Sequence, residues 1–146
     1  MTQNKFLFWQ KWLTYSNVMI IVVGFLVAFA GNSFLFELHN VYTKEVFFNG
    51  NEFSPEVLKM KNWLFGIIGA TIVGFHVLML MISENAFKKK EKWAHNAMWL
   101  GLLSWFCIDS FISVYYSAIY NVWIINLFAL VVIGLPLLIT RKEFYK

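Results

Sequence analysis

Four long apolar stretches decide what this chain can fold into. They cover approximately residues 13–36, 63–82, 97–116 and 119–139 of the 146. The hydrocarbon core of a bilayer is about 30 Å thick, so about 20 helical residues cross it. A loop or an open strand in lipid would leave backbone amides and carbonyls without partners, so each stretch is expected to be helical. The sequence therefore predicts an all-α integral membrane protein that crosses the bilayer four times.

Composition agrees with this prediction. Only 14% of the residues are charged, whereas soluble domains carry about 25%. A length of 146 residues fits a single transmembrane domain, 1–146, and leaves no room for a separate soluble catalytic module.

The first connection, residues 37–62, is expected to be an outer loop. Asn49-Gly50 predicts a tight turn and possible strand pairing on either side of it, as in a small hairpin. Ser54 and Pro55 are typical of an N-cap and a first-turn proline, so the second helix should begin outside the membrane. The later connections are short, which predicts an antiparallel four-helix bundle of up-down-up-down topology.

Cationic residues predict the orientation, because lysine and arginine are retained on the cytoplasmic side. Nine of the twelve lie at the two ends of the chain or between the second and third helices, and three lie in the outer loop. Both termini are therefore expected to be cytoplasmic, in the cytoplasmic membrane of a bacterium. A cleavable signal ending at residues 28–30 is the alternative for the first helix. We favour a retained helix, because the apolar stretch continues to Phe36.

Asp109 is the most informative residue, because an ionisable group inside a transmembrane segment is costly unless it is paired, protonated or hydrated. Ser113 and Tyr116 follow it along the same side of the third helix, and Asn126 and Asn32 lie at a similar depth on other helices. We expect a polar cluster in the outer half of the bundle. Three interpretations stay open: interhelical hydrogen bonds alone, a ligand-binding or proton site, or a subunit interface.

A stripe of small residues and a histidine can each be explained by helix packing or by a function. Gly66, Ala70 and Gly74 form a stripe of small residues that allows close helix packing, either within the bundle or with a second copy. His76 is expected to be a buried neutral histidine bonded to a neighbouring helix. No second histidine at matched depth supports haem, so no cofactor and no metal site are predicted.

Catalytic motifs are not found. The sequence has no phosphate-binding glycine loop, no paired carboxylates and no nucleophile with an adjacent base. The basic residues do not form a patch with interleaved aromatics, so no nucleic-acid partner is expected. A catalytic residue is not predicted, and a non-enzymatic role is favoured.

From about residue 63 to residue 142 the pattern resembles a family of small bacterial four-helix membrane proteins that carries no assigned activity. The residues that carry the resemblance are Gly69, Gly74, Trp93-Ala94, Trp105-Phe106, Asp109-Ser110, Ser113, Asn121, Asn126 and Leu135-Pro136-Leu137. The four-helix layout with an intramembrane acid also resembles the EXPERA family of sterol-binding and sterol-isomerising proteins. The chain departs from that family because it has no second intramembrane acid to partner Asp109.

We therefore expect a non-enzymatic membrane protein that binds lipid or a small molecule, or serves as an accessory subunit. The alternatives are a small proton-coupled homodimeric transporter and an EXPERA-like lipid isomerase. Expected partners are membrane lipid and either a second copy or a larger membrane complex.

Overall fold

The computed structural model describes residues 1–145, and within them every regular element is a helix or a helical turn. The helices are α1 (Gln3–Ala30), α2 (Glu37–Phe48), α3 (Pro55–Ile82), α4 (Lys92–Tyr115), α5 (Ile119–Asn121) and α6 (Leu127–Thr140). Short 3-10 turns occupy Phe34–Phe36 and Arg141–Glu143, and π-helical turns occupy Ser83–Phe87 and Val122–Asn126. The predicted all-α class is confirmed.

Four helical segments are long and apolar enough to cross a membrane. They are Gln3–Ala30, Pro55–Phe87, Lys92–Tyr115 and Ile119–Glu143. Most of their large apolar side chains are exposed, including Phe29 at 86% and Phe111 at 72%. A soluble protein rarely exposes so much contiguous apolar surface. Four helices of this length and hydropathy are consistent with a multi-pass membrane protein.

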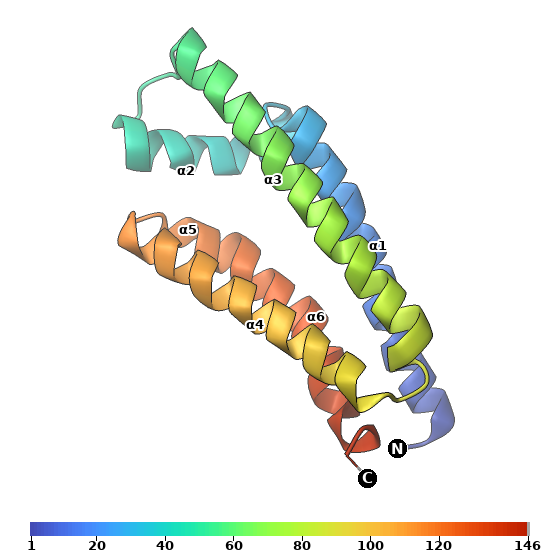
Figure 1. Ribbon diagram of the computed structural model, residues 1–146. Coiled ribbons are helices and arrows are strands. Elements are labelled where there is room, and N and C mark those ends of the chain that lie inside the picture. Colours follow the sequence, from blue (N-terminus) through green and yellow to red (C-terminus); the bar gives the residue numbers. More distant parts are fainter. Residues whose placement is uncertain (146) are drawn as a thin grey trace.

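The helices form two pairs (Figure 1). In the first pair, α1 packs along α3, with the start of α1 beside the end of α3: Gln10 Nε2 donates to the Ser83 carbonyl at 3.4 Å. The second pair consists of α4 and the α5–α6 segment. The pairs meet near the two chain ends and diverge toward the other end, where α2 lies across the opening (Figure 1).

A buried aromatic cluster joins the two pairs where they meet. The rings of Phe87 and Phe144 lie 4.6 Å apart, and that of His95 lies 4.8 Å from Phe144. Phe6 stacks on Phe87 at 5.9 Å. These four residues come from all four apolar segments or the turns that follow them, and none is more than 6% exposed. Close contact at this end therefore ties the pairs together.

The structure corrects the boundaries of the first helix and the nature of the first connection. The predicted helix 13–36 begins at Gln3, where the Thr2 hydroxyl caps it, and ends at Ala30. Residues 37–62 are not an open loop with a hairpin, because most of their first half is the helix α2. Asn49 does turn the chain, but as a left-handed cap of α2 with φ 51°. In a helix, the backbone amides and carbonyls of residues 37–48 bond to one another locally. An isolated two-stranded hairpin at a membrane surface is only marginally stable, so the helix is favoured.

The start of the second apolar helix matches the prediction. Ser54 accepts a hydrogen bond from the Val57 amide, and Pro55 is the first helical residue. Seven residues separate this proline from Trp63, where the apolar stretch begins. The helix therefore starts ahead of that stretch and continues through it.

Candidate polar pocket

Asp109 lies on α4 and collects hydrogen bonds on a single oxygen. Its Oδ1 accepts from Ser113 Oγ at 3.2 Å, Asn121 Nδ2 at 2.7 Å and Asn126 Nδ2 at 2.8 Å. None of these donors is charged, and among residues 1–145 no cation forms an ion pair with Asp109. The Asp109 Oδ2 atom accepts no hydrogen bond from the described residues.

The Asn126 amide directs its NH2 group at the Asp109 carboxyl group. Asn126 is fully buried, and its Nδ2 donates to both Asp109 and Ser110 Oγ. Its Oδ1 is left buried without a partner, which costs about 1–3 kcal/mol for a polar group. The reversed amide would place its oxygen against the Asp109 oxygen. Asn126 therefore keeps its Nδ2 donor on the Asp109 carboxyl group, and its own Oδ1 is left without a partner.

Local backbone features bring the two asparagines to Asp109. Ser117, at φ 60°, lets the chain turn within a few residues between α4 and α5. Asn121 then folds back over Ser113, and its Nδ2 lies 2.9 Å from Ser113 Oγ. Asn126 ends a π-helical turn, whose extra residue rotates the following side chains relative to an α-helix. Such turns are frequent at functional sites.

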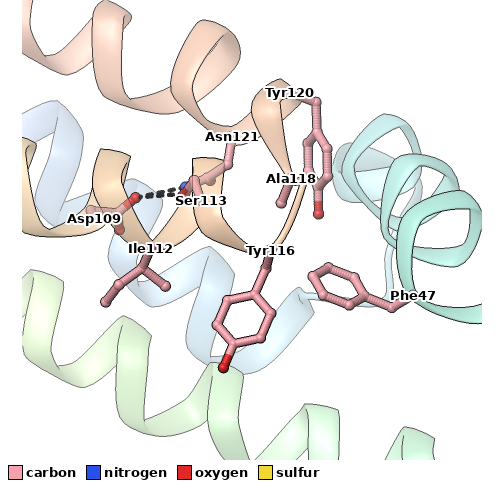
Figure 2. Close-up of a pocket in the computed structure, with 8 residues that line it drawn as sticks. All are labelled: Phe47, Asp109, Ile112, Ser113, Tyr116, Ala118, Tyr120 and Asn121. Carbon is pink, nitrogen blue, oxygen red and sulfur yellow. Dashed lines mark hydrogen bonds between the residues drawn. The ribbon is translucent and has the colours of Figure 1, made fainter.

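A pocket of about 250 Å³ lies beside this cluster. Its lining consists of Phe47, Asp109, Ile112, Ser113, Tyr116, Ala118, Tyr120 and Asn121. Figure 2 shows the carboxyl group on one side and the rings of Phe47, Tyr116 and Tyr120 gathered on the other. Asp109 is the one charged residue in this lining.

Helix α2, at the end where the two helix pairs diverge (Figure 1), forms part of the pocket wall. The hydroxyls of Thr43 and Tyr120 lie 2.9 Å apart, and the ring of Tyr42 stacks on that of Tyr120 at 5.3 Å. His39 packs edge-on against Tyr120 as well. Through these contacts α2 places Phe47 in the pocket wall.

We expect the docking of α2 to weaken at acidic pH. Burial lowers the pKa of the His39 imidazole below its usual value of 6.5, and the positive charge of Lys61 lowers it further. The unfolded segment therefore binds a proton more readily than the docked one, so stability is full above pH 6.5 and falls as the pH drops below it. Hydrogen exchange of residues 37–48, corrected for the intrinsic rate, should show less protection at pH 5 than at pH 7.5.

The control for this effect is His39→Gln, whose side chain does not titrate. Protection of residues 37–48 in this variant should be independent of pH over the same range. An equal loss of protection in the variant would assign the pH dependence to another group.

The structure brings together most of the predicted cluster. Ser113 and Asn126 bond to Asp109, and Tyr116 lines the same pocket. Asn32 does not belong to it: this side chain bonds to Lys61 and Asn62, and it lines a different hollow at the end of α1. Because α1 ends at Ala30, Asn32 lies in a turn that faces α3.

Phe47 was not predicted as part of the site. The Asn49-Gly50 pair favoured strand-like residues around it, whereas residues 46–48 are the last turn of α2. The apolar residues Leu38, Val41 and Tyr42 follow the i, i+3, i+4 spacing of a helix face. That spacing is the signal that predicts a helix here in place of a hairpin.

The small-residue stripe does not pack within the bundle. A Cβ added at Gly66 or Gly74 would meet nothing within 4 Å, and Ala70 is exposed. The close approach of α1 and α3 occurs instead at Gly69, where an added Cβ would lie 2.6 Å from the Ala28 amide nitrogen. The predicted packing role of Gly66, Ala70 and Gly74 inside the bundle is therefore wrong.

His76 bonds to a neighbouring helix, as predicted. Its Nδ1 lies 2.7 Å from Asn17 Oδ1 on α1, and Asn17 is fully buried. Asn17 in turn donates from Nδ2 to the Leu13 carbonyl at 2.7 Å. The histidine thus joins α3 to α1.

Comparisons with protein-family models, with curated proteins and with solved structures return no match. The fold and the site together define a class: a helical protein with four membrane-length apolar helices and a pocket that contains one carboxyl group.

Proposed function

We propose that this chain is a non-enzymatic integral membrane protein that binds one small molecule or lipid headgroup in the pocket beside Asp109. One observation carries the proposal: a carboxyl group inside an apolar helix has three donors on Oδ1, while Oδ2 takes no hydrogen bond and the group lines a pocket. Hydrogen bonds made only for helix packing would not require a pocket. A ligand in the pocket would find Oδ2 accessible as an acceptor.

The proposal includes an orientation. We place the four helices antiparallel in the cytoplasmic membrane of a bacterium, with both termini in the cytoplasm. The excess of lysine and arginine at the chain ends and between α3 and α4 supports this. The Asp109 pocket then opens in the outer half, on the side of α2.

A binding role is favoured over isomerase chemistry by the surroundings of Asp109. Acid–base catalysis on a lipid needs a second group that gives or takes the proton. The residues bonded to Asp109 are a serine and two asparagines, and within residues 1–145 the pocket lining contains no second carboxyl group and no histidine beside its two tyrosine hydroxyls. An EXPERA-like activity therefore has less support than binding.

The test is native mass spectrometry of the protein extracted from its own membrane in a mild detergent. The parent protein should retain one defined small molecule or lipid. Ile112→Trp, which places a large side chain in the pocket lining, should abolish retention. Ile112 is 50% exposed, so the fold should accept tryptophan there.

Ile108→Trp is the matched control. Ile108 is one turn earlier on α4, is 62% exposed and does not line the pocket. This variant should retain the ligand as the parent does. Equal retention by Ile108→Trp and Ile112→Trp would contradict binding in this pocket, and an empty parent would contradict the proposed function.

A homodimeric proton-coupled transporter is the second candidate. The observation that favours it is the outward position of Gly66, Ala70 and Gly74, which leaves a smooth helix surface open to a second copy. The same spectra separate the two functions. A dimer with an empty pocket would favour transport, and a monomer with one bound molecule would favour binding.

A further inference from the structure

We propose that the pocket selects an organic ammonium group, either a soluble amine or the headgroup of a lipid. This inference rests on the proposed binding function and adds the chemical class of the ligand. It follows from the charge of the pocket, from the free oxygen of Asp109 and from the aromatic wall.

The charge of the site is the first ground. Asp109 is the one carboxylic acid in the lining, and its three hydrogen-bond partners are neutral. No lysine or arginine among the described residues forms an ion pair with it. A carboxyl group inside an apolar helix is costly unless it is paired, protonated or hydrated. A cationic ligand would pair with it, while an anionic ligand would be repelled by it.

The second ground is that the two carboxyl oxygens of Asp109 differ in their hydrogen bonding. Oδ1 already accepts from Ser113, Asn121 and Asn126, and these bonds hold the carboxyl group in one orientation. Oδ2 accepts none from the described residues. An ammonium group is the complement of such an oxygen, because it carries positive charge and, unless it is quaternary, N–H donors.

The aromatic wall is the third ground. Phe47, Tyr116 and Tyr120 line the side of the pocket away from the carboxyl group (Figure 2). The faces of such rings attract cations, and cages of this kind recognise alkylammonium groups. A hydrated metal ion would instead need several oxygen ligands. Here both asparagine side chains present NH2 groups, not oxygens, to Asp109.

The experiment uses the full chain in nanodiscs of phosphatidylglycerol, a lipid without an ammonium group. Isothermal titration calorimetry compares choline with 3,3-dimethyl-1-butanol, which has the same shape but no charge. Choline should bind at least about tenfold more tightly, the factor that 1.4 kcal/mol of charge recognition supplies. Asp109→Asn should lower choline affinity to that of the alcohol and leave the alcohol unchanged.

Asp109→Asn keeps an oxygen at the Oδ1 position for the two asparagine donors, so the helices should still assemble. Tyr116→Leu is a second variant that removes one ring from the wall at a residue that is 58% exposed. It should weaken choline binding more than binding of the alcohol, because only the cation gains from the electrostatic attraction of the ring. These two variants test the charge and the aromatic wall separately.

The source of the ammonium group is tested by adding phosphatidylethanolamine to the nanodiscs. Competition with choline indicates a lipid headgroup, and unchanged choline affinity indicates a soluble amine. Equal affinity for choline and the alcohol would overturn ammonium selection while leaving the pocket in place. Failure of both choline and the alcohol to bind would also overturn ammonium selection. The binding function is decided independently, by the molecule that the protein retains in native mass spectrometry.

Discussion

Gly69→Ala should destabilise the protein by about 1–3 kcal/mol, the usual cost of overpacking a tight interior. A Cβ at this position would lie 2.6 Å from the Ala28 amide nitrogen and 2.7 Å from the Ala28 Cβ. It would also press on the Gly24 carbonyl oxygen, and backbone atoms of α1 cannot move aside as a flexible side chain can. The free energy of unfolding, measured by steric trapping in micelles, should fall accordingly.

Gly66→Ala and Gly74→Ala are the matched controls on the same helix. An added Cβ meets nothing within 4 Å at either position. Alanine also favours a helix over glycine by about 1 kcal/mol, so both variants should be as stable as the parent or more stable. A loss at Gly74 as large as that at Gly69 would mean that the stripe is covered, and a second copy would be its first candidate.

Phe87→Ala should have the largest effect on stability, about 3–5 kcal/mol, which is typical of removing a fully buried phenylalanine. Its ring contacts Phe6, His95 and Phe144, so one substitution removes several of the contacts that join the helix pairs. Phe87 is 0% exposed, and the surrounding rings cannot fill the space without moving helices. The same unfolding measurement checks this result.

Phe29→Ala serves as the control, because this ring is 86% exposed on α1. An exposed substitution usually changes stability by no more than about 0.5 kcal/mol. A small effect for Phe87→Ala, similar to that of Phe29→Ala, would show that the pairs are joined elsewhere. The ion pair of Lys90 with Glu143, at 2.9 Å, would then be the next contact to test.

The local pattern predicts the cap of α3 and the position of Asp109 correctly, for physical reasons that need no tertiary contact. A serine hydroxyl reaches the amide of Val57 within its own turn, and proline has no amide to lose at the first helical position. Asp109 interrupts an apolar segment whatever surrounds it. Ser113 is four residues away, which places it on the same helix face.

Contacts between helices were harder to predict. Asn32 was expected beside Asp109 because their depths agree, but depth along a helix does not say which way a side chain faces. The stripe of Gly66, Ala70 and Gly74 has ideal spacing for packing, yet Gly69 is the residue that α1 covers. Successive residues are rotated by 100°, so the choice among glycines depends on where the neighbouring helix lies.

The helical class, the four membrane-length helices and the single acid within the apolar stretches could all be read from the residues alone, because they depend on hydropathy and on backbone hydrogen bonding in lipid. The position of α2 across the opening and the π-helical turn that carries Asn126 to Asp109 became visible only in the folded chain. Both depend on contacts between residues far apart in the chain, such as Thr43 with Tyr120. The pocket exists because those contacts bring an aromatic wall to a carboxyl group that the apolar pattern had already placed.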